Sequence, residues 1–171
     1  GFNSGVATAE WIFKMTKNVA ETPSLLDGSW SFSPEAGAMG VGPNPGDYGW
    51  WSIDEAGVTT RSCLFDDEYV FNADGSFTNV QGADTWLENW QAGAPAEGCG
   101  AAIAPHDGSI AATYTVDAAA GTVTIVGSGA YLGLSKVTNQ GEVGVATDDT
   151  KVYSYVLSED GATVDFTIQG F

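Results

Sequence analysis

Hydrophobic and polar residues alternate along most of the chain, in short runs separated by turns rich in glycine, asparagine and aspartate. Such period-two runs are typical of β-strands with one buried face, and the spacing of an amphipathic helix is scarce here. Each of three pairs of runs flanks a short polar turn and predicts an antiparallel hairpin. The pairs are residues 68–72 with 77–80, 112–116 with 122–126, and 152–157 with 163–168. We therefore predict an all-β chain built as an antiparallel meander.

Two further segments alternate in the same way and predict one strand each, residues 28–32 and the stretch from Glu10 to Met15. Between residues 33 and 49 the chain is rich in glycine and proline, which predicts a long irregular loop. Long loops on β-scaffolds often carry function, so this loop is a candidate region for binding.

One short helix is predicted, over residues 84–91. The side chain of Asp84 can accept a hydrogen bond from the first turn of such a helix, and Trp86 and Trp90 would lie on one side of it. The prediction places two tryptophans side by side in the segment that the two cysteines bracket.

Length and charge narrow the class of protein. The 171 residues are 43% hydrophobic, which is enough to bury one core. The chain has 22 acidic residues against 5 basic ones, a formal net charge of −17. Nucleic acids and anionic membranes would both be repelled, so we expect neither as a partner, and no apolar run is long enough for membrane insertion. The acidity also has a simple explanation, since it keeps a secreted protein soluble in salty water.

The chain contains two cysteines, Cys63 and Cys99. Neither belongs to a CxxC motif or a Cys/His cluster, so their spacing does not indicate redox or zinc chemistry. We predict that they form a disulfide, which indicates an oxidising compartment and hence a secreted or cell-surface, extracellular protein. Two buried reduced thiols are the alternative.

Candidates for catalysis are few. The one histidine, His106, lies in a turn-like segment, and the sequence contains no nucleophile elbow, zinc-protease helix or phosphate-binding loop. Two acids facing each other across a sugar would suffice for glycoside hydrolysis, and Glu68 with Glu88 is the pair to consider. With 22 acidic residues, however, such a pair carries little information. We expect a protein that is not an enzyme.

Clustered acidic residues suggest one metal site. Asp66, Asp67 and Glu68 are consecutive, and their carboxylates are the hard oxygen ligands that calcium prefers. The loop pattern of an EF-hand does not occur, and acidic turns are more often only solvated. We expect no cofactor, with a structural calcium ion at these three residues as the alternative.

Aromatic residues give the clearest lead to a binding function, because a sugar can stack its apolar face on an aromatic ring while acids and amides bind its hydroxyls. Trp50 and Trp51 are adjacent, so on an extended chain one of them should belong to the core and the other should be freer. Core packing is the competing interpretation for all the tryptophans, and it is the prediction for Trp30. The candidates for glycan binding are Tyr48, Trp50, Trp51, Trp86, Trp90, Asp66, Asp67, Glu88, His106 and Asp107.

Five longer segments are distinctive: LDGSWSFSPEAGAMGVGPNPGDYGWWS (26–52), CLFDDEYVFNADGSF (63–77), TWLENWQ (85–91), CGAAIAPHDGS (99–109) and GAYLGLSK (129–136). They resemble a secreted module of marine Bacteroidetes surface and carbohydrate-active multidomain proteins. The L-x-G-x-W opening and the Y-x-F-x-x-D-G-x-F hairpin also resemble the lipocalin-like group of barrels. The resemblance implies an antiparallel lipocalin-like barrel or sandwich with one short helix and long Gly/Pro-rich loops.

These observations predict a non-catalytic, secreted cell-surface module that binds a neutral glycan, with a polysaccharide as its partner. The alternative is a structural tandem repeat or donor-strand subunit of an extracellular fibre, filament or adhesin. It rests on the stretch from Glu10 to Met15, which would complete a last hairpin if it followed the final residues of the chain. Copies of the chain would then pair head to tail, and an ordinary strand that pairs within its own chain is the other interpretation. The chain is accordingly divided into an N-terminal strand and connector, residues 1–23, and a β module, residues 24–171.

Overall fold

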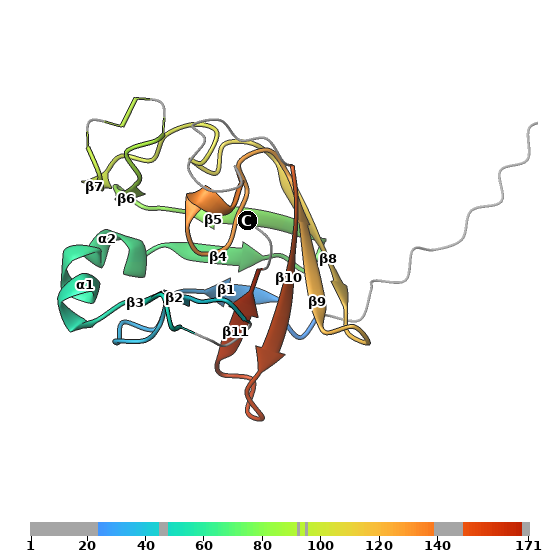
Figure 1. The fold of residues 1–171 in the computed structure, drawn as a ribbon. Coiled ribbons are helices and arrows are strands. Elements are labelled where there is room, and N and C mark those ends of the chain that lie inside the picture. The colour runs from blue at the N-terminus through green and yellow to red at the C-terminus, as the bar shows by residue number, and fades with distance from the viewer. Residues whose placement is uncertain (1–23, 45–47, 92, 95, 139–148, 169–171) are drawn as a thin grey trace, which may run out of the picture.

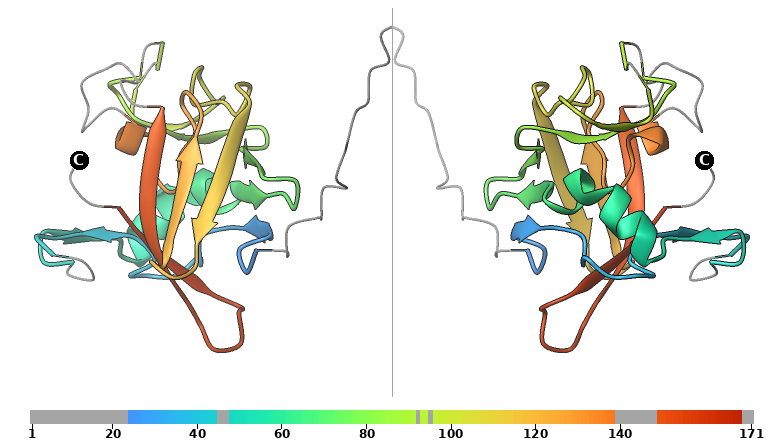
Figure 2. Two further views of the ribbon diagram at one scale, coloured as in Figure 1. Left: turned by 90° about the vertical axis from the view of Figure 1, so that its right-hand side faces the viewer. Right: turned by 90° about the vertical axis from the view of Figure 1, so that its left-hand side faces the viewer.

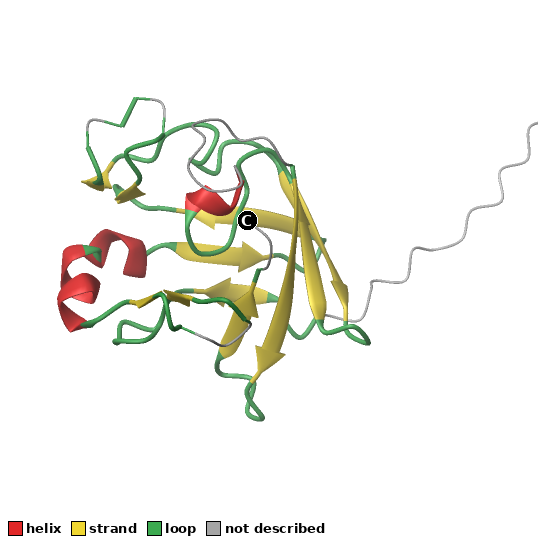
Figure 3. Cartoon of the chain, viewed as in Figure 1, coloured by secondary structure: helices red, strands yellow, loops and turns green. Residues whose placement is uncertain are grey.

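The computed structural model describes residues 24–44, 48–91, 93, 94, 96–138 and 149–168. In this part of the chain seven strands form one antiparallel sheet, in the order β1, β4, β5, β8, β9, β10 and β11. The sheet curls around its inner face into a half-barrel (Figures 1 and 3). The prediction of an all-β fold is confirmed, and the curled sheet is consistent with a lipocalin-like architecture.

The three predicted hairpins are present as β4–β5, β8–β9 and β10–β11. Gly75 follows Asp74 in the first turn with a φ of 83°, a left-handed conformation that glycine adopts without strain. The stretch from Glu10 to Met15 lies outside the described residues. The strands of the main sheet are β1 (Gly28–Trp30), β4 (Glu68–Phe71), β5 (Ser76–Val80), β8 (Ala112–Asp117), β9 (Thr122–Val126), β10 (Thr150–Leu157) and β11 (Val164–Thr167).

Aromatic rings fill the inside of the half-barrel. The ring of Phe71 on β4 lies edge-on to Phe77 and to Tyr114, with centroid distances of 5.1 and 4.9 Å. Phe166 on β11 stacks on Phe71 at 6.1 Å, so the last strand curls back over the same core. Trp30 packs against this core but is only half-buried, so its predicted core position is confirmed in part. Between the described strands, aromatic side chains therefore pack against one another on the inner face of the sheet.

The prediction of a helix over residues 84–91 is wrong. The chain forms β6 (Thr85–Leu87) there, which pairs with β7 (Gly98–Gly100) in a separate two-stranded sheet. Thr85, Trp86 and Leu87 are all buried. A short run that is buried on every side has no polar face, so its periodicity cannot distinguish a strand from a helix.

The helices lie elsewhere, as α1 (Glu55–Thr60), α2 (Ser62–Phe65) and the 3₁₀ turn η1 (Ser135–Thr138). Helix α1 begins at Asp54, whose carboxylate accepts a hydrogen bond from the N–H of Gly57 at 2.7 Å. This capping residue is the signal in the sequence for a helix at this point.

The Gly/Pro-rich region contains a small sheet of its own rather than only irregular loop. In this sheet β2 (Gly40–Val41) pairs with β3 (Trp51–Ser52). Figure 2 shows this hairpin projecting from the side of the curled sheet.

The predicted disulfide is confirmed and joins Cys63 on α2 to Cys99 on β7, 36 residues apart in the chain. It fits an oxidising or extracellular environment. In the described residues, no helix has the length and apolar character needed to cross a membrane.

Candidate functional site

Three exposed aromatic side chains lie in and next to the β2–β3 hairpin: Tyr48, Trp50 and Trp51, which we call the aromatic surface. Their side chains are 51%, 71% and 41% exposed, respectively. The prediction that one of the two adjacent tryptophans belongs to the core is wrong. Both are exposed because the hairpin projects from the half-barrel, so that both faces of β3 reach solvent.

Close backbone contacts fix part of this surface. The ring of Tyr48 lies directly against the backbone of Gly40, where an added Cβ would come within 2.5 Å of the ring carbon Cδ1. Glycine is therefore required at this position for the ring to approach the strand. The N–H of Trp50 donates to the carbonyl oxygen of Val41 at 3.1 Å. The hairpin thus fixes the ring of Tyr48 and the backbone of Trp50.

Arg61 connects the aromatic surface to the body of the protein. Its guanidinium carbon lies 4.2 Å from the ring centroid of Trp86 and 5.7 Å from that of Trp51, both within the range of cation–π contacts. The guanidinium also pairs with the carboxylate of Glu97 at 3.4 Å. Sequence analysis did not single out Arg61, although it is the only arginine in a strongly acidic chain, and that rarity is the signal that could have identified it.

The other candidates for glycan binding lie apart from this surface. Trp86, Asp67, Glu88 and His106 are each more than nine-tenths buried. The side chain of Trp90 is half-buried, whereas Asp66 and Asp107 reach solvent. The buried members contact other protein groups rather than solvent, so of the predicted site residues only the aromatic surface, the exposed acids and part of Trp90 are accessible to a ligand.

The buried candidates around His106 form a hydrogen-bond network that determines the imidazole tautomer. The hydroxyl of Thr138 donates to the carbonyl oxygen of Ser135, so its oxygen is left to accept from Nε2 of His106 at 2.8 Å. On the other side, the amide oxygen of Gln91 accepts from the N–H of Glu88, which directs the amide nitrogen of Gln91 towards Nδ1 of His106 at 3.5 Å. The imidazole is therefore neutral, with its proton on Nε2.

Burial lowers the pKa of His106 to about 4, against the small opposing effect of Asp107. The unfolded chain, with an ordinary pKa of 6.5, binds a proton in this range that the folded protein does not. The contribution of His106 to the free energy of unfolding should therefore fall as the pH falls from 6.5 towards 4, so the free energy of unfolding of wild type relative to that of H106N should fall by about 3 kcal/mol across this range. Urea unfolding of wild type and H106N across this range measures it. If the free energies of unfolding of wild type and H106N differed by the same amount at every pH, the lowered pKa of His106 would be refuted.

A second buried network surrounds Asp67. The hydroxyl of Thr85 donates to Oδ2 of Asp67 at 2.6 Å, and the amide nitrogen of Gln81 donates to the hydroxyl oxygen of Tyr131 at 2.7 Å. Burial raises the pKa of Asp67 to about 7, the bond from Thr85 opposes this rise, and the charges of neighbouring acids add to it. Within the described residues Oδ1 of Asp67 has no hydrogen-bond partner. This carboxyl is therefore neutral below pH 7 and a destabilising buried charge above it.

The proposed calcium ligands do not converge. Asp67 points into the protein, whereas Glu68 lies on the exposed face of β4 and accepts a hydrogen bond from the hydroxyl of Ser29 at 2.6 Å. Across the described residues, the one group of three potential ligands within 4.8 Å of one another is Cys63, Asp84 and Cys99. Its two sulfurs form the disulfide, so they are not available to a metal ion.

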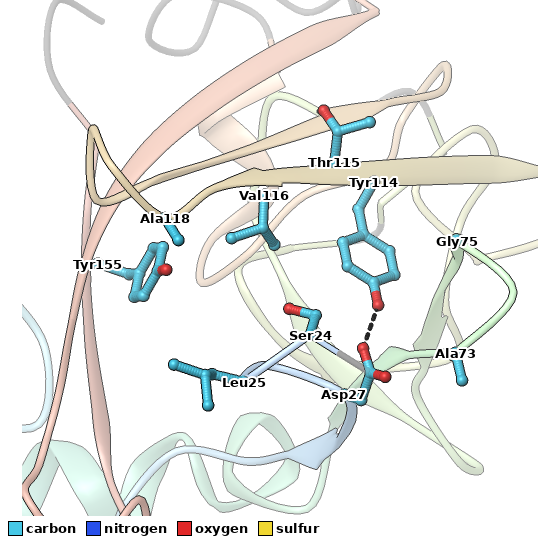
Figure 4. Close-up of a pocket in the computed structure, with 10 residues that line it drawn as sticks. All are labelled: Ser24, Leu25, Asp27, Ala73, Gly75, Tyr114, Thr115, Val116, Ala118 and Tyr155. Carbon is cyan, nitrogen blue, oxygen red and sulfur yellow. Dashed lines mark hydrogen bonds between the residues drawn. The ribbon is translucent and has the colours of Figure 1, made fainter. Parts of the chain in front are cut away.

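A groove of about 420 Å³ lies at the end of the half-barrel where β4 turns into β5 (Figure 4). Leu25, Val116 and Tyr155 give it apolar walls. The hydroxyl of Tyr114 donates to Oδ1 of Asp27, while Oδ2 of Asp27 is enclosed and has no partner among the described residues. The groove is lined by both polar and apolar side chains, Ser24 and Thr115 among the polar ones, and this mixture does not define a class of ligand.

No protein-family model matches the chain, and neither a curated protein nor a solved structure matches it. A function must therefore be argued from the residues and contacts of this chain.

Proposed function

We propose that this chain is a secreted, non-catalytic cell-surface module that binds a neutral glycan on the aromatic surface. The observation that carries the proposal is the exposure of Tyr48, Trp50 and Trp51 on one projecting hairpin. Exposed large aromatic residues in a group are costly to keep in water and usually mark a binding surface. The ring of Tyr48, which packs against Gly40, loses little conformational entropy when it binds.

The charge of the protein supports a neutral ligand. A formal charge of −17 repels carboxylated and sulfated polysaccharides. Arg61 is a cation beside the aromatic surface, and its charge is already paired with Glu97 and stacked on Trp86. An uncharged sugar can stack on the indole rings without an electrostatic cost.

The absence of catalysis is part of the proposal. The one histidine of the chain is enclosed and neutral, and both of its ring nitrogens have protein partners. Glu88, the buried member of the carboxylate pair considered above, pairs with Lys136 at 3.4 Å. Secretion is supported by the disulfide and by the acidity.

The test is retention on polysaccharides in native gels, with neutral β-glucans and algal polysaccharides as ligands and alginate as an acidic contrast. W50A should weaken binding to the neutral ligand by about 30-fold, equivalent to about 2 kcal/mol, because the most exposed ring supplies the stacking surface. Its melting temperature should remain that of wild type, since Trp50 is 71% exposed.

The matched control is V156A, which removes a similarly exposed apolar side chain from the outer face of β10, 69% exposed. This variant should bind as wild type does. Failure of the wild-type protein to bind any neutral polysaccharide, or equal binding by W50A, would refute the proposal.

A second candidate function is that of a structural repeat or donor-strand subunit of an extracellular fibre or adhesin. One observation favours it: the main sheet ends at β1 and β11, and each of these strands has only one neighbour among the described strands. An unpaired edge can accept a strand from another copy of the chain. The cross-linking experiment described in the next section decides whether strands are exchanged between copies.

A further inference from the structure

The direction of the strands shows what the half-barrel needs in order to close. Every neighbouring pair in the main sheet is antiparallel, and six such steps lead from β1 to β11. An even number of reversals leaves β1 and β11 running in the same direction. The two edges therefore cannot complete the antiparallel pattern with each other, whereas one more strand, antiparallel to both, can.

The burial of β11 indicates that its free side is where the core is open. Val164, Phe166 and Ile168 pack against the core, yet each is only half-buried. Core residues of the central strands are almost completely buried, for example Val123 and Ile125 at 0% and 1% exposure. A neighbour beyond β11 would cover the half-buried residues in the same way.

We propose that residues 10–15 of the same chain form this eighth strand, between β11 and β1. Their sequence alternates so that Trp11, Phe13 and Met15 share one face and Ile12 and Lys14 the other. The apolar face would extend the core. The face that contains Ile12 and Lys14 would then point outwards and place a lysine at a strongly acidic surface.

Charge complementarity predicts the register. Asp165 lies between Val164 and Phe166 and is exposed on the outer face of β11. An antiparallel strand that places Lys14 opposite Asp165 also places Phe13 opposite Phe166 on the inner face. The same register pairs Trp11 with Ile168 and Met15 with Val164, so every inner pair is apolar and the outer charged pair is of opposite sign.

The connection within one chain is short enough. Residues 24–27 form a turn before β1, so residues 16–23 make the connection; at about 3.3 Å per residue they can span about 26 Å, more than the roughly 20 Å of a six-residue strand. Strands that follow one another in the sequence usually lie next to one another in a sheet. Both arguments favour the strand of the same chain over that of a second copy.

The test is a disulfide cross-link in the full-length chain. K14C/D165C should form, under mild oxidation, a disulfide within one chain, identified by peptide mapping in protein of monomer mass. The matched control K14C/T115C places the second thiol on the exposed face of β8, a central strand, and should not cross-link. Cross-linked dimers of K14C/D165C would show that copies exchange the strand and would overturn the proposal, and so would the absence of any cross-link at this pair.

Charge reversal tests the register without new thiols. K14E should lower the melting temperature by more than K17E, which makes the same change of charge outside the strand. K14E/D165K should restore the melting temperature of wild type, because positions 14 and 165 then carry opposite charges again, with their signs exchanged. Equal effects of K14E and K17E, or no recovery in the double variant, would overturn the register. None of these results depends on whether the protein binds a glycan.

Discussion

The D67N variant should become more stable relative to wild type as the pH rises from about 4 to about 7. In the folded protein burial raises the pKa of Asp67 from 3.8 to about 7. Between these values the folded protein keeps a proton on Asp67 that the unfolded chain has released, so the contribution of Asp67 to the free energy of unfolding falls as the pH rises. Asparagine does not titrate. The free energy of unfolding of D67N relative to that of wild type should therefore grow by about 4 kcal/mol across this range and stay constant above it.

The measurement is urea unfolding of both proteins at a series of pH values from 4 to 8. The comparison uses only the change with pH, so it does not depend on how well the asparagine amide fits at Asp67. If D67N and wild type differed by the same amount at every pH, the raised pKa would be refuted.

Removal of the disulfide should have an effect of similar size. C63A/C99A should lower the free energy of unfolding by about 4 kcal/mol, because a cross-link that spans 36 residues restricts the unfolded chain. Such a loss is a large fraction of the stability of a typical domain. Cys63 is itself buried against Leu64 and Trp86, so the missing sulfur adds a packing defect.

Urea unfolding with and without a phosphine reductant provides the control. Reduction should lower the urea midpoint of wild type and leave that of C63A/C99A unchanged. Identical midpoints for oxidised and reduced wild type would show that the cross-link does not contribute to stability.

The hairpins could be predicted from the sequence because their signals are local. In β8 and β9 the alternation of buried and exposed residues matches the alternation of sequence, and glycine or aspartate stands at the turns. The helix over residues 84–91 could not be excluded, because Thr85, Trp86 and Leu87 are all buried and their spacing fits either structure.

The buried networks could not be predicted, because they join residues that are far apart in the chain. Thr138 lies 32 positions from His106, and Tyr131 lies 50 positions from Gln81. No periodicity connects such pairs. The exposure of Trp51 likewise depends on the projection of the whole β2–β3 hairpin from the half-barrel, which is a property of the tertiary structure.

The two buried networks together imply that folding transfers a proton inside the molecule. At about pH 5.5 the unfolded chain carries a proton on the imidazole of His106, whereas the folded protein carries one on the carboxyl of Asp67. For these two groups, folding neither takes up a proton from the solvent nor releases one. Their opposite contributions to the pH dependence cancel in wild type, and each single substitution reveals the contribution of the other group. A D67N/H106N double variant should therefore respond to pH in this range much as wild type does, although it contains neither group.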